Sequence, residues 1–319
     1  MVKIAKTLLG LAAFAMGLLV ILYGLSFLFV PKNNTKDAGM EEIYANGIQG
    51  EPPNSIDVVV VGDSESYSSI SPLHIWKTTG YTSYVCGSGR QYLSYSKTLL
   101  ERAFETQSPK LVILETLCIY RQIPAKTVVM DEVSRYLPIL RYHDRWKVMT
   151  REDFSPTDGN SYTTPYKGYR HNNKVSGADT SNYMAQTEKI ASIPLVNRLL
   201  VKQIQELCEA NGAKLLLLST PSTVNWNYQR HNGIQELADE LDLEYIDLNT
   251  KPQEVPIDWS TDTYDRGDHL NYSGSRKVSQ FLAKYLEGTQ MFSDRRGDSK
   301  YASWNTLLQD YEAKVENAS

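Results

Sequence analysis

Five short segments rich in apolar residues recur along the chain, and three of them contain continuous apolar runs, at 58–61, 111–114 and 215–218. The five segments lie at 56–61, 81–86, 111–115, 214–219 and 244–248. Continuous runs of this length are typical of strands buried on both faces of a sheet. Stretches with helical spacing of apolar residues separate these segments, at about 91–107, 195–210, 231–241 and 273–286. This alternation predicts an α/β fold, a three-layer flavodoxin-like domain with a five-stranded parallel sheet in the order 2-1-3-4-5.

A different apolar segment precedes these runs. Residues 7–30 carry no charge, and as a helix they extend for about 36 Å at roughly 1.5 Å per residue, which is enough to cross a bilayer. A cleaved signal peptide is the alternative, but its apolar region is normally about 7–15 residues and an A-x-A site follows it. We therefore predict a single-pass membrane anchor. Lys3 and Lys6 precede the segment, and we place the N-terminus inside and the bulk of the chain outside the cell.

The pattern divides the chain into four predicted parts. Residues 1–30 are the cytoplasmic tip and anchor, 31–55 a stalk, 56–288 the catalytic domain and 289–319 a C-terminal tail. The interval 121–193 interrupts the strand–helix alternation, and loops of that length are usually functional or disordered. Because it contains Trp146 and six tyrosines, it is predicted to be a cap insertion that is ordered in part. In the tail, four apolar residues with the spacing of one helix face predict a short amphipathic helix docked on the domain: Trp304, Leu307, Leu308 and Tyr311.

Composition narrows the class of protein. The formal net charge is −4, so no basic surface indicates nucleic-acid binding. The three cysteines are widely spaced, which fits neither a zinc pattern nor an even disulfide set. The histidines show no helical metal-site spacing. We predict no metal and no cofactor.

The candidate chemistry begins where the first apolar run stops, at Gly62-Asp63-Ser64. In an open α/β sheet, ligands bind beyond the carboxyl ends of the strands, so Ser64 lies where a nucleophile would lie. A serine hydroxyl needs a base, and the base needs a group that holds its tautomer. His269 is the candidate base, and Asp265 and Asp268 are the candidate orienting carboxylates. The amides of Ser64 and of Gly87 or Gly89 could stabilise the oxyanion.

Together, Gly62-Asp63-Ser64, the glycines after the second segment and the distal Asp/His loop resemble the SGNH/GDSL hydrolase superfamily. The order of features is similar to its membrane-anchored bacterial branch, which includes the D-alanine-transfer protein of teichoic acid modification and the alginate and peptidoglycan O-acetylation proteins. The resemblance covers roughly residues 56–288. It implies substrate-binding roles for a further set of residues: Glu115, Arg121, His143, Trp146 and Asn271.

Two positions depart from the superfamily pattern. Where the superfamily places a Gly-x-Asn whose amide serves the oxyanion hole, this chain has Leu114-Glu115-Thr116. That donor is therefore missing, replaced by Thr116 or supplied by the cap. The usual Asp-x-x-His would put the acid at Arg266. Asp265 fits with one inserted residue and is preferred, while the adjacent Asp268 stays an alternative.

The resemblance implies a serine O-acyltransferase at the bacterial cell membrane, with its catalytic domain on the extracellular side. It would transfer acetyl or a similar acyl group to a cell-surface glycan through an acyl-enzyme, and a membrane-bound O-acyltransferase would be its donor partner. Two alternatives remain. One is an esterase that removes acyl groups from a glycan, and the other is a catalytically silent glycan-binding or scaffold subunit of an acylation complex.

Overall fold

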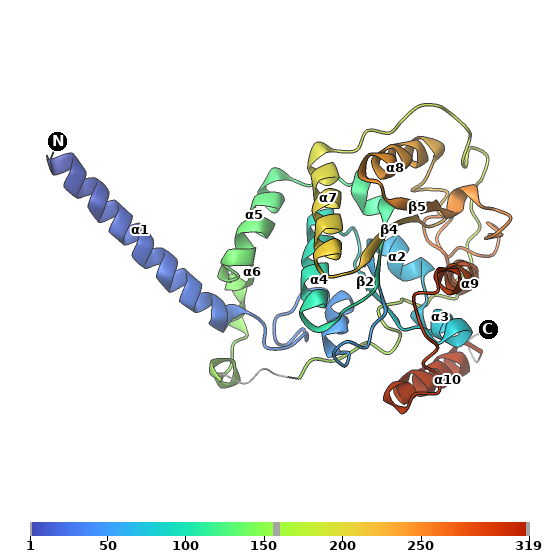
Figure 1. The fold of residues 1–319 in the computed structure, drawn as a ribbon, viewed down its shortest axis with the longest axis horizontal. Coiled ribbons are helices and arrows are strands. Elements are labelled where there is room, and N and C mark those ends of the chain that lie inside the picture. The colour runs from blue at the N-terminus through green and yellow to red at the C-terminus, as the bar shows by residue number, and fades with distance from the viewer. Residues whose placement is uncertain (1, 156–159, 317–319) are drawn as a thin grey trace. The chain divides into compact units, whose positions relative to one another are not determined.

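The computed structural model describes residues 2–155 and 160–316, and a parallel sheet forms its centre (Figure 1). Its strands are β1 (Val58–Gly62), β2 (Ser83–Gly87), β3 (Leu111–Glu115), β4 (Lys214–Ser219) and β5 (Glu244–Asp247). Within the described residues the order is β2-β1-β3-β4-β5, and every neighbouring pair is parallel. The predicted fold class and strand order are confirmed.

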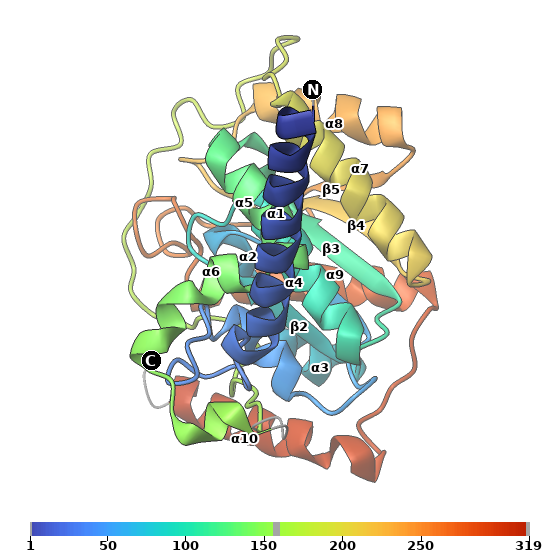
Figure 2. The same ribbon diagram turned by 90° about the vertical axis from the view of Figure 1, so that its left-hand side faces the viewer.

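Helices cover both faces of this sheet. The pleat of β1 turns Val59 and Val61 toward one face and Val58 and Val60 toward the other. The first face packs against α4 (Leu93–Thr106), α7 (Leu195–Ala210) and α8 (Tyr228–Leu241). The second packs against α9 (Tyr272–Thr289). The result is the predicted three-layer arrangement (Figures 1 and 2).

Helix caps explain where the observed ends differ from the predicted ones. The helix expected near 231–241 begins at Tyr228, because the Asn227 side chain accepts a hydrogen bond from the backbone N–H of Arg230. Ser71 caps α3 (Pro72–Thr79) in the same way, with proline at the first helical position as the sequence indicates. A short helix, α2 (Ser64–Ser69), follows β1 directly.

The chain forms two compact units, which are described separately. Unit 1 comprises residues 1–43 and 124–161, and unit 2 comprises 44–123 and 162–319. The predicted stalk thus contributes its second half to unit 2, where Ala45 and Ile48 are buried because they pack in the main core. The predicted insertion is likewise divided at residue 161 between the two units. Its residues 156–159, and residues 317–319 of the tail, lie outside the described residues.

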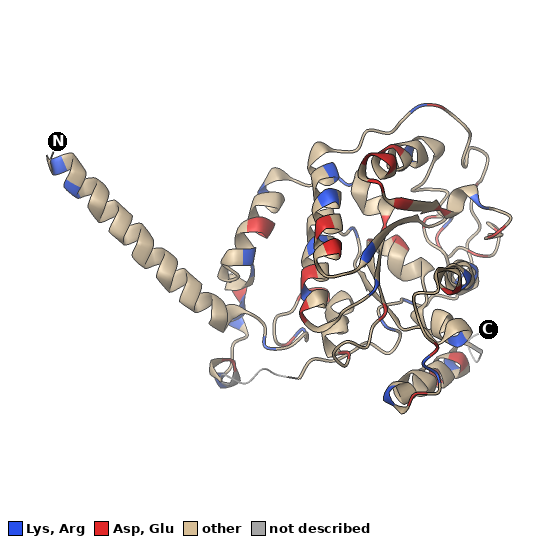
Figure 3. Ribbon diagram, in the orientation of Figure 1, with Lys and Arg blue, Asp and Glu red and all other residues tan. Residues whose placement is uncertain are grey.

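Unit 1 contains α1 (Val2–Phe29), α5 (Ala125–Tyr136) and α6 (Ile139–Tyr142). Helix α1 has a mean hydropathy of 2.4 in its most apolar window and is long and apolar enough to cross a membrane. Figure 3 shows charged residues near its N-terminal end and none along the rest of the helix. Its last turn is fixed to residues of the insertion, where the Ser26 hydroxyl accepts a 3.2 Å hydrogen bond from the N–H of Ile139.

In unit 2, the tail docks on the domain as predicted. Helix α10 (Ala302–Glu316) packs against α3, and the Trp304 ring lies 5.3 Å from that of Trp76. Trp304 and Tyr311 are both buried. The apolar stripe read from the sequence therefore faces the core.

Candidate functional site

Ser64 is the first residue of α2 and lies directly beyond the carboxyl end of β1. The preceding Asp63 caps the helix, accepting a 3.2 Å hydrogen bond from the N–H of Glu65. The chain can turn here because Gly62 has no side chain: a Cβ atom on it would lie 2.6 Å from the Cβ of Glu115. As the first helical residue, Ser64 has an N–H with no carbonyl partner within the helix. The serine therefore presents both its hydroxyl and its amide at this edge of the sheet.

His269 lies on a loop that closes between Thr263 and Leu270, which form an isolated antiparallel bridge. The Thr263 hydroxyl donates to the carbonyl of His269 and accepts from the N–H of Gly267, both at 2.8 Å. Gly267 has a φ of +93°, and a Cβ atom there would collide with the Thr223 hydroxyl. Arg266 also has a positive φ. Between Asp265 and His269 the loop has one residue more than the Asp-x-x-His spacing allows. This tight turn accommodates the extra residue.

The two candidate acids differ in their relation to the imidazole. Asp265 Oδ2 lies 2.6 Å from Nδ1 of His269, and its Oδ1 accepts a 2.7 Å hydrogen bond from the His269 backbone N–H. Asp268 Oδ1 lies 3.7 Å from the same nitrogen. On the ring face, Tyr264 stacks at 5.5 Å with an interplanar angle of 7°. Asp265 therefore orients the ring, and it fixes the Nδ1–H tautomer.

The other ring nitrogen of His269 has no hydrogen-bond partner among the described residues. Nε2 is buried, although buried polar atoms are normally paired. With Nδ1 protonated and held by Asp265, Nε2 carries the lone pair and can accept a proton. A general base needs this free lone pair and also a hydrogen bond to its nucleophile, and Nε2 makes no such bond to Ser64 in this structure.

The residues on either side of Ser64 face the His269 loop. One carboxylate oxygen of Glu65, one of Asp268 and one ring nitrogen of His269 all lie within 4.8 Å of one another. The amide of Asn225 bridges the two segments, donating to Glu65 Oε1 at 2.8 Å and also to Asp268 Oδ1. Two parts of the chain some two hundred residues apart are thus brought together at Glu65, the residue that follows Ser64.

Three buried carboxyl groups lie beneath Ser64: Asp63, Glu65 and Glu115. Burial raises the pKa of Glu65 and of Glu115 well above the usual range, and the nearby carboxylates raise them further. Burial also raises the pKa of Asp63, but the Arg121 guanidinium, at 2.8 Å, opposes this effect. Burial therefore favours the protonated form of Glu65 and of Glu115, while the Arg121 guanidinium favours the charged form of Asp63.

The candidate oxyanion donors lie in two places: Gly87 and Gly89 lie beside α2, and Thr116 lies at the end of β3. Gly87 pairs with Gly62 across β1 and β2, and a Cβ atom on it would lie 2.4 Å from the Ser66 hydroxyl. A Cβ atom on Gly89 would meet only the Tyr67 hydroxyl, at 3.9 Å. Both glycines therefore lie beside α2. The buried Thr116 hydroxyl, by contrast, is hydrogen-bonded to Ser219 at 2.6 Å inside the sheet.

The predicted substrate-binding residues lie in different parts of the structure. Glu115 and Arg121 belong to the buried ion cluster around Asp63. Asn271 caps α9, and its amide donates to the carbonyls of Lys174 and Thr261, so both ends of its side chain bind backbone. His143 and Trp146 are exposed residues of unit 1. The structure assigns Asn271 a structural role at the start of the helix that follows His269.

Sequence reasoning missed Asn225 and Glu65. Asn225 follows β4, so the rule that ligands gather beyond strand ends, applied to that strand, would have identified it. Its loop is tied to the base because the Ser222 hydroxyl donates to the carbonyls of Gly267 and Asp268. Glu65 directly follows Ser64, but nothing in the local sequence indicates that its side chain is buried. The trio Glu65, Asp268 and His269 also has the spacing to hold a metal ion, although Asn225 already donates to both carboxylates.

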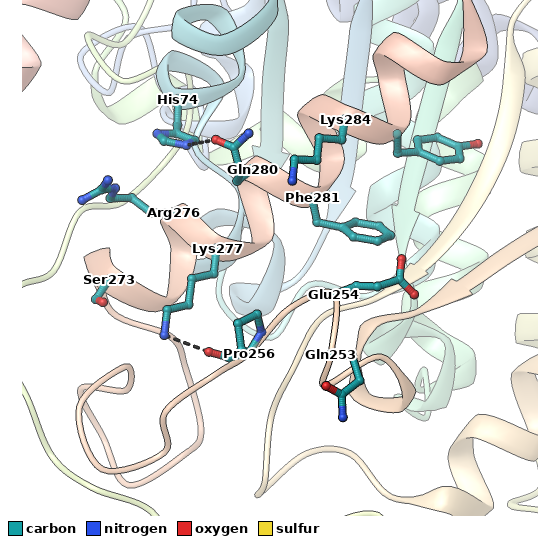
Figure 4. Close-up of a pocket in the computed structure, with 11 residues that line it drawn as sticks. His74, Gln253, Glu254, Pro256, Ser273, Arg276, Lys277, Gln280, Phe281 and Lys284 are labelled. Carbon is teal, nitrogen blue, oxygen red and sulfur yellow. Dashed lines mark hydrogen bonds between the residues drawn. The ribbon is translucent and has the colours of Figure 1, made fainter.

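A pocket of about 800 Å³ lies elsewhere in unit 2, along the outer side of α9 (Figure 4). Arg276, Lys277 and Lys284 line it, and Lys277 donates to the carbonyl of Pro256 at 2.8 Å. Neither Ser64 nor His269 contributes to its wall. This pocket is therefore separate from the candidate active site.

Comparison with known proteins gives structural likenesses only. No family model and no curated protein matches the sequence. Among solved structures, the chain is similar to a GDSL-like lipase from Bacteroides thetaiotaomicron (12% identity, TM-score 0.39, covering 77% of this chain and 99% of that one). It is also similar to a lipase/acylhydrolase from Enterococcus faecalis (11%, 0.39, 73% and 97%) and to an acetyl xylan esterase (14%, 0.38, 72% and 99%). At these values, the function has to be argued from the site itself.

Proposed function

We propose that this protein is a membrane-anchored serine acyl-ester enzyme with Ser64 as nucleophile, His269 as base and Asp265 as the orienting acid. The observation that carries the proposal is the state of the imidazole. Nδ1 is held by Asp265 at 2.6 Å, while Nε2 is buried and has no partner in the described chain. The loop that bears this ring meets Glu65, the neighbour of Ser64. A merely structural histidine would normally satisfy both nitrogens.

The proposed reaction has two halves. Ser64 Oγ attacks the acyl carbonyl as His269 Nε2 takes its proton, and the oxyanion that forms is stabilised by the amides of Ser64 and of Gly87 or Gly89. The intermediate collapses, His269 returns the proton to the leaving oxygen, and the acyl group stays on Ser64. An acceptor hydroxyl then loses its proton to His269 and attacks the acyl-enzyme, and this second intermediate collapses as His269 passes the proton to Ser64 Oγ, which releases the acylated acceptor and restores free serine.

We place this chemistry outside a bacterial cell, as O-acyl transfer to a surface glycan. The apolar α1 supports an anchor, and an anchor would keep the enzyme beside a membrane-borne acyl donor. A membrane-bound O-acyltransferase would supply the acyl group. Hydrolysis is the alternative outcome of the same acyl-enzyme, because only the acceptor differs: a sugar hydroxyl in one case and water in the other.

The nucleophile is tested by Ser64→Ala. We expect turnover of an acetyl-ester reporter to fall to background, with an unchanged circular dichroism spectrum. We also expect a fluorophosphonate probe to label the unmodified protein but not the variant. Ser273→Ala, an exposed serine on α9, is the matched control and should keep both signals. Full activity in Ser64→Ala would disprove the mechanism, and absence of labelling in the unmodified protein would favour the silent-subunit alternative.

Transfer and hydrolysis are separated in cells. In a strain that lacks the protein, mass analysis of the surface glycans should show fewer acetyl groups if the enzyme is a transferase. An increase would indicate an esterase instead. Complementation with the Ser64→Ala form should leave either defect uncorrected.

A further inference from the structure

The polar and apolar faces of helix α5 are reversed relative to those of a helix on a water-soluble domain. Its buried or half-buried residues are mostly polar: Thr127, Asp131 and Ser134, together with one apolar residue, Val128. On that side the Asp131 carboxylate pairs with the Arg141 guanidinium. The opposite side carries exposed apolar and aromatic residues: Val129, Met130, Val133 and Tyr136. Val129 is 59% and Tyr136 is 68% exposed.

The same character continues after α6. Trp146 is 66% and Phe154 is 69% exposed, and Val148 between them is also exposed. Lys147 and Arg151 are interspersed with these side chains. Aromatic rings among lysines and arginines are the combination found at membrane–water interfaces, because each side chain has an apolar body and a polar end.

This segment is attached to the end of α1. The buried Arg145 donates from Nη1 to the carbonyls of Leu28, Phe29 and Val30, at 3.3, 2.7 and 2.8 Å. Its Nη2 donates to Asp153. Free carbonyls at a helix C-terminus attract cations, so the guanidinium satisfies the end of α1 while holding the segment against it. Residues 125–154, called here the juxtamembrane segment, are therefore bound to the C-terminal end of α1 through Arg145.

The length of α1 fits a membrane that reaches this junction. Its 28 residues extend about 42 Å at roughly 1.5 Å per residue, against a hydrocarbon core of about 30 Å. The helix can therefore pass beyond the core into the headgroup region. Near that end, the exposed rings of Tyr23 and Phe27 have their centroids 5.1 Å apart. Aromatic residues are enriched at membrane–water interfaces.

From these observations we propose that the juxtamembrane segment lies in the lipid interface on the side where α1 leaves the bilayer, with the Val129–Val133–Tyr136 stripe and the Trp146 and Phe154 rings among the lipids. The proposal rests on the membrane anchorage proposed above. Lipid is the occupant that the structure favours, because the segment is bound to the end of a helix long and apolar enough to cross a membrane, and cations flank its exposed apolar side chains. The chain would then contact the membrane through more than one helix.

Site-directed spin labelling of the full chain tests this contact. The native cysteines, Cys86, Cys118 and Cys208, are all buried, so single labels can be introduced at Val133→Cys and Phe154→Cys. In nanodiscs of phosphatidylcholine and phosphatidylglycerol, power saturation compares the access of oxygen with that of a water-soluble nickel chelate. We expect a ratio of oxygen to nickel access several-fold higher at both sites than at the control Val175→Cys, an exposed residue of unit 2.

A label at Val20→Cys, an exposed residue within α1, separates this proposal from the anchor itself. If Val20 reports lipid while Val133 and Phe154 report water, the juxtamembrane proposal is wrong and the anchor stands. If both reagents are excluded from Val133 and Phe154, protein covers the segment, and the lipid proposal is equally wrong. If Val20 itself reports water, the anchorage fails.

Discussion

At the residue scale, the imidazole of His269 lies between two carboxylates that hold it differently. Asp265 binds both the ring and the backbone of the histidine, so its position relative to Nδ1 is fixed by two hydrogen bonds. Asp268 receives the amide of Asn225 and lies 3.7 Å from Nδ1, outside hydrogen-bond distance. The two acids should therefore contribute unequally to catalysis.

Asp265→Asn should lower kcat for the ester reporter roughly 10²–10⁴-fold, because an amide cannot stabilise the imidazolium or fix its tautomer as a carboxylate does. Asp268→Asn should cost about tenfold or less, since its contribution is electrostatic only. Steady-state kinetics of both variants, at matched circular dichroism, gives the comparison. A larger loss for Asp268→Asn would reverse the assignment of the orienting acid.

The buried Glu115 gives a pH dependence of stability with a definite sign. Its folded pKa is raised, first by burial and then by Asp63, so the folded protein keeps a proton that the unfolded chain releases above about pH 4.5. Its contribution to stability is complete below that pH and is lost as the pH rises toward the folded pKa. The loss is at most about 1.4 kcal/mol per pH unit.

Glu115→Gln should remove this pH-dependent contribution to stability. Unfolding of the full chain in detergent, followed across the neutral range, should show a smaller decrease in stability with rising pH for the variant than for the unmodified protein. Glu188→Gln, at an exposed position, should show the same decrease in stability with pH as the unmodified protein. Parallel profiles for Glu115→Gln and the unmodified protein would mean that Glu115 does not retain its proton on folding.

Sequence alone could single out Ser64, His269 and Asp265 as candidates, because each is marked by its position relative to a strand end or by spacing along one loop. It could not identify the role of Asn225. That role depends on the loop after β4 reaching both Glu65 and Asp268, which only the folded chain shows. Nor could sequence show that Asn271 caps α9 rather than facing a ligand.

At the element scale, β2 and α2 approach so closely that only glycine fits between them. The Cβ of an alanine at position 87 would lie 2.4 Å from the Ser66 hydroxyl, which itself donates to the carbonyl of Asp63 at 2.7 Å. Relief of this clash needs either rotation of the Ser66 hydroxyl, which breaks that hydrogen bond, or a shift of α2, which begins with Ser64.

Gly87→Ala should therefore lower kcat and also destabilise the fold by about 1–3 kcal/mol, as overpacking does. Gly288→Ala is the matched control, because that glycine lies in α9 with no other heavy atom within 4 Å of the added methyl group. It should stabilise the protein by about 0.4–1 kcal/mol and leave kcat unchanged. Denaturant unfolding and ester kinetics measure both effects, and an unaltered kcat in Gly87→Ala would show that α2 tolerates the methyl group in place.

The elements themselves were the most predictable part of the molecule. Continuous apolar runs such as β1 mark buried parallel strands whatever surrounds them, so the sheet order followed from general rules of α/β connection. The division of the insertion at residue 161 was not predictable. It depends on Arg145 and Ile139 binding the end of α1, and no periodicity encodes such contacts.

At the scale of the whole molecule, the contacts at the end of α1 bear on whether the helix is kept. A signal peptide is removed, so the mature fold should not depend on it. Here Arg145 is buried, and its guanidinium satisfies carbonyls of Leu28, Phe29 and Val30. Removal of α1 would leave that buried cation with Asp153 as its remaining hydrogen-bond partner in the described chain, at a cost of about 1.5–3 kcal/mol for each charged hydrogen bond lost.

We therefore expect the mature protein to retain α1. Intact mass measurement of the protein purified from membranes should include residues 2–30, and alkaline carbonate should fail to extract it. The buried Arg145 explains the expected result, because cleavage after Val30 would remove the acceptors that compensate for its burial. A mature N-terminus beyond Val30 together with release into the soluble fraction would identify the segment as a signal peptide. The acyl-ester chemistry proposed at Ser64 would be unaffected by that result, since its residues all belong to unit 2.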